Sequence, residues 1–254
     1  INAACPELQL PESELCREAD GAVYAIPVRE YWEGLFCNKD LFDLYGLELP
    51  TTWEKLETAA RVFRENGVVP LAVSLSDQPH YIAEFCLLCC GGEEAHRQRP
   101  ASIEEVPGSW TEGMALLRQM QQEGFFPEDT EVIIASEASQ LFLQKKAAMQ
   151  IDGSWFANSL PEDRMDSTVV LPFPSRNGDS SAIIRGVSMG FYLTRKAWNS
   201  PRRDAAVDLL SYLATGSNAR ALGGYGFTGA LLKSADAMLA SHPERLSPVQ
   251  DAMS

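Results

Sequence analysis

The chain has 254 residues, 45% of them hydrophobic and 9% aromatic, so it can form one large or two modest folded domains, and disorder is not the default. Lys and Arg total 21 against 35 Asp and Glu, which gives a formal net charge of −14 at pH 7. Such a surface repels phosphate backbones and anionic lipid head groups, so we expect neither nucleic acid nor a membrane surface as a partner. No stretch approaches about 18 consecutive apolar residues, so the sequence predicts no membrane-spanning segment.

The first part of the sequence predicts short strands that alternate with capped helices. Residues 22–26 and 34–37 have the composition of extended segments. Asn38 is placed to cap a short helix. Residues 51–54, Thr-Thr-Trp-Glu, have the pattern of a capping box and open an amphipathic helix that stops at Asn66 before a glycine.

The middle of the chain continues this alternation. Residues 71–75 form the next predicted strand, and a buried helix through Cys90 follows. Residues 91–108 are rich in Gly, Glu, Arg and Pro and predict a surface loop. Ser109 is then expected to cap an amphipathic helix. Its predicted apolar face consists of Met114, Leu117 and Met120.

The last part predicts two further helices and three further strands. One helix carries Ala138, Leu141 and Phe142, and the other covers residues 204–213. The strands are expected at residues 147–151, 169–171 and 186–194. The tail from residue 216 shows only helical patches. Strands alternating with helices indicate an α/β class with mainly parallel or mixed sheets.

Six cysteines leave two questions open. Cys5 and Cys16 flank a short loop and could form a disulfide in an oxidising compartment. Residues 86–90 read Cys-Leu-Leu-Cys-Cys, with two histidines near them, which permits a zinc or redox site. The run is strongly apolar and the sequence has no second CxxC. We therefore favour buried thiols and predict neither a metal nor a cofactor.

Catalytic motifs are not found in the sequence. It has no GxSxG elbow, P-loop, HExxH or kinase motif, so we do not expect an enzyme. Paired carboxylates, such as Glu30 with Glu33 or Asp152 with a distant partner, could serve a glycoside hydrolase. Because carboxylates are common on surfaces, solvated side chains are the favoured interpretation of these residues.

Aromatic side chains stand beside several predicted chain reversals. Tyr31 and Trp32 follow a strand that ends at a proline, and Trp155 follows an Asp-Gly-Ser turn. His80 and Tyr81 open a helix after a polar loop. Aromatic rings beside carboxylates suit carbohydrates, because the ring stacks on the apolar sugar face while carboxylates accept hydroxyl hydrogen bonds. The remaining tryptophans that begin helices, Trp53 and Trp110, are expected in the core.

Several segments resemble one family in a consistent order along residues 18–250. The first are Gly-Ala-Val-Tyr-Ala-Ile-Pro at 21–27, Leu-Phe-Cys-Asn-Lys-Asp-Leu-Phe at 35–42 and Pro-Thr-Thr-Trp-Glu at 50–54. A second block is Phe-Leu-Gln-Lys-Lys-Ala-Ala-Met at 142–149 with Asp-Gly-Ser-Trp at 152–155. On these segments the chain resembles the family 1 extracellular solute-binding proteins of bacterial ABC importers, of the sugar-binding, maltose-binding-like type.

This resemblance implies an α/β fold of the periplasmic-binding-protein-like type II, with two lobes and a hinge, incomplete in this chain. It implies that residues 1–27 end the N-terminal lobe and form the first crossover, and that 28–172 form the C-terminal lobe. Residues 173–230 would return to the N-terminal lobe, and 231–254 would turn back toward the C-terminal lobe. Intact members are longer, so we expect this chain to lack an N-terminal region and to bind its solute weakly.

The function implied is capture of a solute, expected to be a carbohydrate, outside the cytoplasm and its delivery to an ABC transporter permease. The protein would act as a monomer, anchored to the cell surface by lipid or free in a periplasm. A non-sugar polar solute is the alternative, and a glycoside hydrolase a weaker one. Cys37 replaces an expected stacking Tyr, which argues against a long maltodextrin. The expected ligand-binding residues are Glu30, Tyr31, Trp32, His80, Tyr81, Asp152, Trp155 and Arg185.

Overall fold

The computed structural model describes residues 25–176, 183–214, 218 and 227–241, without the side chains of residues 27–30 and 187–189. The chain divides into two compact units. Unit 1 comprises Ile1–Trp32, Arg185–Tyr225 and Arg245–Ser254, and unit 2 comprises Glu33–Ile184 and Gly226–Glu244. The lobe boundaries implied by the resemblance remain predictions.

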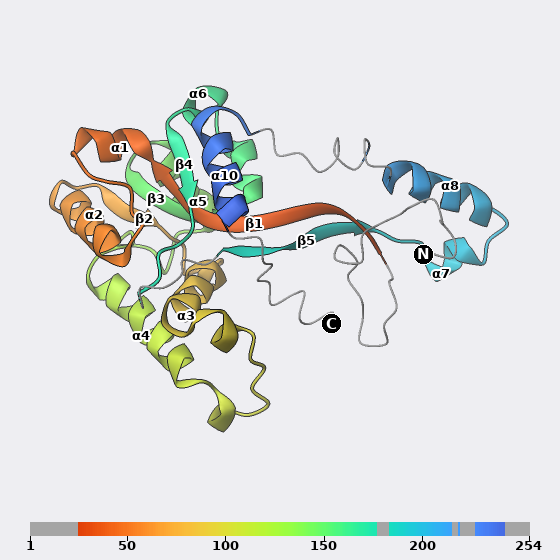
Figure 1. Ribbon diagram of the computed structural model, residues 1–254, viewed down its shortest axis with the longest axis horizontal. Coiled ribbons are helices and arrows are strands. Elements are labelled where there is room, and N and C mark those ends of the chain that lie inside the picture. Colours follow the sequence, from red (N-terminus) through yellow and green to blue (C-terminus); the bar gives the residue numbers. More distant parts are fainter. Residues whose placement is uncertain (1–24, 177–182, 215–217, 219–226, 242–254) are drawn as a thin grey trace. The chain divides into compact units, whose positions relative to one another are not determined.

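The strands of the described residues form one mixed sheet. Its order is β2-β3-β1-β4, and β5 also pairs with β1 (Figure 1). β2 and β3 are parallel, whereas β1 runs antiparallel to β3 and to β4. This pairing confirms the predicted α/β class with a mixed sheet. The strands are β1 Ile26–Asn38, β2 Val69–Ala72, β3 Ala147–Gly153, β4 Thr168–Leu171 and β5 Ile184–Phe191.

β1 corrects the prediction of two separate extended segments near the start of the chain. It is one continuous strand of 13 residues, Ile26–Asn38. In its second half Leu35 lies opposite Ile151 of β3 and Leu171 of β4, so the strand has partners on both sides. Backbone pairing of this kind keeps the intervening polar residues extended, which composition alone does not predict. Residues 22–24 lie outside the described part of the chain.

Seven helices and two 3₁₀ turns accompany the sheet in the described part of unit 2. In Figure 1, α10 lies along β4 and α2 lies beside β2, and α3 packs against α4. α2 begins and ends where the sequence predicts, with the Thr52 hydroxyl accepting from the Lys55 backbone N–H. The helices are α1 Lys39–Leu44, α2 Trp53–Glu65, α3 Pro79–His96, α4 Gly108–Gln122, α5 Ala135–Leu143, α6 Glu162–Met165 and α10 Gly229–Ser241, and the 3₁₀ turns are η2 Ile103–Glu105 and η3 Ser154–Ser159.

Two further predictions are wrong in detail. α3 continues to His96, six residues into the predicted loop, because Gly92 adopts φ 64° and lets the helix kink rather than end. The apolar face of α4 is rotated from the predicted one, since Leu116 and Met120 are buried while Met114 is 50% exposed. Packing against α3 decides this face, and the hydrophobic spacing in the sequence allowed both.

The core of unit 2 is built from aromatic and aliphatic side chains on both sides of the sheet. Phe156 makes edge-to-face contacts with Phe36 and Phe142, with ring centroids 5.2 and 5.6 Å apart. Cys86 and Cys89 are buried on α3, and the thiol of Cys89 donates to the carbonyl of Pro174 at 3.4 Å. Burial raises the pKa of the Cys89 thiol to about 12. The buried position of these thiols confirms that part of the prediction.

The described part of unit 1 includes the first half of β1, most of β5 and the helices α7 Arg195–Trp198 and α8 Arg203–Ala214. Its buried cluster consists of Ile26, Leu210 and Ala214, against which Phe191 and Leu193 pack. The helix predicted for residues 204–213 is confirmed as α8. The strand predicted for residues 186–194 is confirmed as β5, which begins and ends somewhat earlier.

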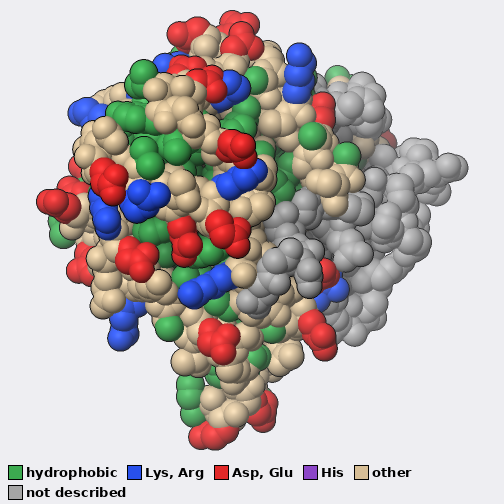
Figure 2. All heavy atoms as spheres, turned by 60° about the vertical axis from the view of Figure 1, so that its left-hand side comes forward, with side chains coloured by type: hydrophobic (Ala, Val, Ile, Leu, Met, Phe, Trp, Pro, Cys, Tyr) green, Lys and Arg blue, Asp and Glu red, His purple; other side chains and the backbone are tan. Residues whose placement is uncertain are grey.

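None of the described helices is both long and apolar enough to cross a membrane. Figure 2 shows acidic and basic side chains mixed over the face that it presents, with small apolar areas between them. Among the described residues no group of three His, Cys, Asp or Glu side chains is placed to hold a metal ion.

Candidate functional site

The site lies at one edge of the sheet in unit 2. Because β2 and β3 are parallel, their carboxyl ends at Ala72 and Gly153 face the same edge. The chain leaves β2 into the loop that starts α3, and leaves β3 directly into η3. In open α/β sheets, ligands bind beside the carboxyl ends of the strands. This topology gathers side chains from three elements that are far apart in the sequence.

Two aromatic rings mark this edge. The ring centroids of Tyr81 on α3 and Trp155 on η3 lie 6.2 Å apart, at an interplanar angle of 41°. The exposed His80 ring lies 4.4 Å from that of Tyr81. Trp155 packs over the last residue of β3, since a Cβ added at Gly153 would come 2.2 Å from its ring. Both rings are half-buried, so part of each surface remains open to solvent.

Asp152 places a carboxylate next to these rings. Its side chain is 8% exposed, and it accepts from the Gly153 backbone N–H at 2.7 Å and from the Gln150 amide at 2.8 Å. Burial raises the pKa of Asp152 to about 6, although hydrogen bonds from Gly153, Gln150 and Trp155 oppose this shift. The carboxylate is therefore held in a fixed orientation beside the Trp155 indole.

Glu33 brings a second carboxyl group to the same place. It lies on β1 opposite Gly153 and is 5% exposed. Its Oε2 atom has no hydrogen-bond partner among the described residues. Burial raises the pKa of Glu33 to about 8, with smaller contributions from the charges of Glu84 and Asp152. Glu84, on α3, is itself hydrogen-bonded to His96 at 2.7 Å.

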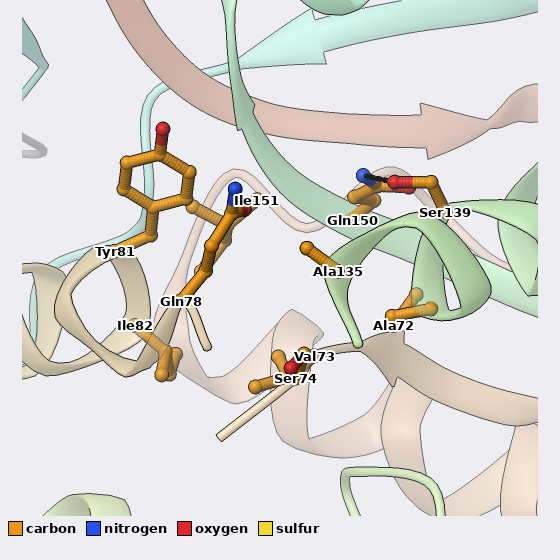
Figure 3. A pocket seen from close by; sticks show the side chains of 11 residues that line it. Ala72, Val73, Ser74, Gln78, Tyr81, Ile82, Ala135, Ser139, Gln150 and Ile151 are labelled. Carbon is orange, nitrogen blue, oxygen red and sulfur yellow. Dashed lines mark hydrogen bonds between the residues drawn. The ribbon is translucent and has the colours of Figure 1, made fainter. Parts of the chain in front are cut away.

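A small pocket adjoins these groups between β2, α3, α5 and β3. Figure 3 shows the Gln150 side chain directed toward Ser139 on α5, with Tyr81 and Gln78 on the α3 side. The Gln150 amide donates to Ser139 Oγ and to Asp152 Oδ2, both at 2.8 Å, so it connects the pocket wall to the carboxylate. The pocket is lined by Ala72, Val73, Ser74, Gln78, Tyr81, Ile82, Ala135, Ala138, Ser139, Gln150 and Ile151.

Four of the eight predicted ligand-binding residues belong to unit 2. Tyr81, Asp152 and Trp155 are brought together there, with His80 against Tyr81. The other four belong to unit 1: Glu30, Tyr31, Trp32 and Arg185. Within unit 1, Trp32 is buried, Tyr31 and Arg185 are half-buried, and the Glu30 side chain lies outside the described ones. All eight assignments remain predictions.

Sequence reasoning missed three polar residues of this edge. The sequence predicts Glu33 only as a possible hydrolase carboxylate and does not single out Glu84 or Gln150. A signal for Glu33 is present in the chain: it is an acidic residue within a strand whose next four positions are all apolar. Buried polar residues in such runs are unusual, and they draw attention to a site.

Residues 6–219 match the family model described as bacterial extracellular solute-binding protein. The chain belongs to this family.

The relatives that it matches are longer proteins. It is 24% identical over 218 residues to the melibiose/raffinose/stachyose-binding protein MelE of Bacillus subtilis (strain 168), covering 82% of this chain and 50% of that protein. The chain therefore spans half the length of this relative.

Solved structures share the fold. A chitin oligosaccharide binding protein aligns with a TM-score of 0.77 at 20% identity, over 99% of this chain and 68% of its own. A sugar transporter protein of Bacillus licheniformis in complex with stachyose aligns with a TM-score of 0.65 at 18% identity, over 95% and 71%. At these identities the structures establish the fold alone, and they confirm the predicted periplasmic-binding-protein-like fold.

Proposed function

We propose that the protein captures a small oligosaccharide outside the cytoplasm and delivers it to the membrane permease of an ABC importer. The description of the family supports solute capture in an extracytoplasmic location. The name of the Bacillus subtilis relative supports sugars of the melibiose, raffinose and stachyose type. The observation that carries the proposal is the Tyr81–Trp155 pair beside the buried Asp152 carboxyl group.

The chemistry of this edge suits a sugar. A pyranose ring has an apolar face, which stacks on an indole or phenol ring, and hydroxyl groups at its rim, which donate to carboxylates. Trp155 and Tyr81 supply the stacking surfaces in this proposal, and Asp152 accepts hydroxyl hydrogen bonds. His80 contacts the ligand at its rim. Glu30, Tyr31, Trp32 and Arg185 stay as proposed contacts from unit 1.

The proposal also covers how the protein works and where it is held. It acts as a monomer without a cofactor, does not hydrolyse its ligand, and is held at the cell surface by a lipid anchor or is free in a periplasm. Catalysis is tested by incubating the protein with raffinose and separating the products chromatographically. Intact raffinose is the expected result, and release of galactose or sucrose would establish a hydrolase instead.

The binding test is isothermal titration calorimetry with melibiose, raffinose and stachyose. It uses the full-length gene product, with residues 1–254 beside it. We expect at least one of the three sugars to bind. Trp155→Ala should weaken that binding about tenfold or more, because burying an aromatic ring contributes about 1.5–3 kcal/mol.

Trp198→Ala is the matched control. Trp198 is an exposed tryptophan on α7 of unit 1, and its removal should leave the affinity unchanged. If no sugar binds to a well-folded full-length protein, the solute is a different polar molecule. If Trp155→Ala binds as the wild type does, the assignment of Trp155 is wrong.

A further inference from the structure

Glu33 has an unusual environment for a carboxyl group. It is 5% exposed, its Oε2 has no partner among the described residues, and within the same part of the chain only the acidic groups Glu84 and Asp152 shift its pKa through their charges. A buried, ionised carboxylate with no partner is strongly destabilising, so such a group takes up a proton instead. A neutral Glu33 that carries its proton on Oε2 has a hydrogen-bond donor with no acceptor among the described residues.

The carboxyl groups whose charges act on Glu33 come from two other elements. Asp152 on β3 lies one position before Gly153, the residue opposite Glu33, so its side chain leaves the other face of the sheet and acts on Glu33 through its charge. Glu84 on α3 lies three positions after Tyr81, so the two share a helix face. The Glu84 carboxyl group is in turn hydrogen-bonded to the His96 ring at 2.7 Å.

The other strands that pair with β1 add little charge. β4 has no charged residue, and the only one of β5 is Arg185, which belongs to unit 1. On β1 itself, the side chains of Arg29 and Glu30 lie outside the described ones.

Glu33 therefore stands beside the aromatic pair and one carboxylate of the proposed sugar site. We propose that Glu33 is a further ligand-binding residue, which donates a hydrogen bond from its neutral carboxyl group to a sugar oxygen and loses this contact when it ionises. The inference rests on the proposed function, because it names a residue of the same site and the protonation state that this residue needs. It makes capture of the sugar dependent on pH.

Two electrostatic effects oppose ionisation when the ligand is bound. The bound sugar excludes water, so an ionised Glu33 would lose its remaining solvation. It would also add a negative charge next to Glu84 and Asp152. Burial and these two charges raise the pKa of Glu33 to about 8. The ionisation of Glu33 therefore falls within a pH range in which binding can be measured.

The experiment measures the Kd of the best-binding sugar among melibiose, raffinose and stachyose between pH 6 and pH 9.5. The wild-type Kd should level off near pH 7, above the pKa of Asp152, and rise roughly tenfold per pH unit well above the pKa of Glu33 in the free protein. Glu33→Gln keeps a neutral donor of the same shape. It should bind within about threefold of the wild type at pH 6.5, with a Kd that changes less than twofold up to pH 9.5.

Two further variants separate the proposed role from a general effect of charge. Glu84→Gln removes a like charge near Glu33, so the midpoint of the Kd increase should move to lower pH. Glu94→Gln makes the same change in net charge at an exposed position of α3, and should titrate as the wild type does.

The outcomes distinguish the two proposals. If none of the three sugars binds at any pH, the proposed function fails and this inference fails with it. If a sugar binds with the same pH profile in the wild type and in Glu33→Gln, this inference alone is overturned. A ¹³C NMR titration of the Glu33 carboxyl group provides a second measurement. It should show a higher midpoint with the sugar bound than without, and equal midpoints would also overturn the inference.

Discussion

Gly153 has no side chain at the position where the indole of Trp155 crosses the end of β3. A Cβ there would lie 2.2, 2.3 and 2.5 Å from three atoms of the indole, which is closer than real carbon atoms approach. The neighbouring strand is antiparallel β1, so the backbone cannot move away easily. The orientation of Trp155 therefore depends on the absence of a side chain at Gly153, the last residue of β3.

Gly153→Ala should accordingly displace the Trp155 ring. We expect the affinity for the bound sugar to fall severalfold and the tryptophan emission spectrum to shift, while the fold is retained. Gly108→Ala is the control, because a Cβ at Gly108 meets no atom within 4 Å. Calorimetry and fluorescence test both variants, and unchanged emission and affinity in Gly153→Ala would contradict this packing.

The side chain of Asn38 connects several secondary-structure elements. The sequence places it before α1 and predicts a helix cap, and it is indeed the N-cap residue, but its side chain makes no capping hydrogen bond. Its amide instead donates to the carbonyls of Phe142 and Ala147, at 3.0 and 2.8 Å, and accepts from Arg164 at 2.6 Å. One side chain thus joins the end of β1 to α5, β3 and α6.

Asn38→Ala should be strongly destabilising, because it leaves two buried carbonyls and a guanidinium without this partner. We expect the free energy of unfolding to fall by about 2–4 kcal/mol. Asn66→Ala is the control: Asn66 is exposed at the end of α2 and donates one hydrogen bond, to the Val62 carbonyl at 2.8 Å. Its loss should be about 1 kcal/mol or less. Urea denaturation measures both, and equal losses would contradict the role of Asn38.

The helices and strands also show which features of the fold the sequence predicts and which it does not. α2 was predicted at both ends, since its cap, its hydrophobic spacing and its terminal Asn-Gly are all local signals. The length of β1, the continuation of α3 past Gly92 and the buried face of α4 depend on neighbouring elements. Local composition contains no information about those neighbours.

For the molecule as a whole, the buried carboxyl groups set a pH dependence of stability. The pKa of Glu33 is about 8 in the folded protein against 4.5 as its ordinary value, so the folded state holds this proton more tightly than the unfolded state. The free energy of unfolding must then decrease as pH rises from about 4.5 to about 8. Asp152 acts with the same sign between 3.8 and about 6.

Glu33→Gln should remove the part of this decrease that lies above about pH 6. One pKa unit corresponds to about 1.4 kcal/mol, so the wild type should lose about 2–3 kcal/mol between pH 6 and pH 8 that the variant keeps. Urea unfolding at several pH values, without ligand, measures this difference, with Glu94→Gln as the charge control. Parallel curves for the wild type and Glu33→Gln would show that Glu33 is not buried as described.

The amino-acid sequence by itself determined the α/β class, most of the helices and strands, and the family, because these depend on local caps, periodicity and short ordered motifs. It also pointed to Tyr81, Asp152 and Trp155, since aromatic and acidic residues at strand ends are visible along the chain. Only the tertiary structure shows that Glu33 is buried at the same end of the sheet, opposite Gly153. Residues 33, 84 and 152 lie on three separate elements, and antiparallel pairing of β1 with β3 and the packing of α3 bring their carboxyl groups together. Burial in that arrangement sets the protonation state, and burial is a property of the folded chain alone.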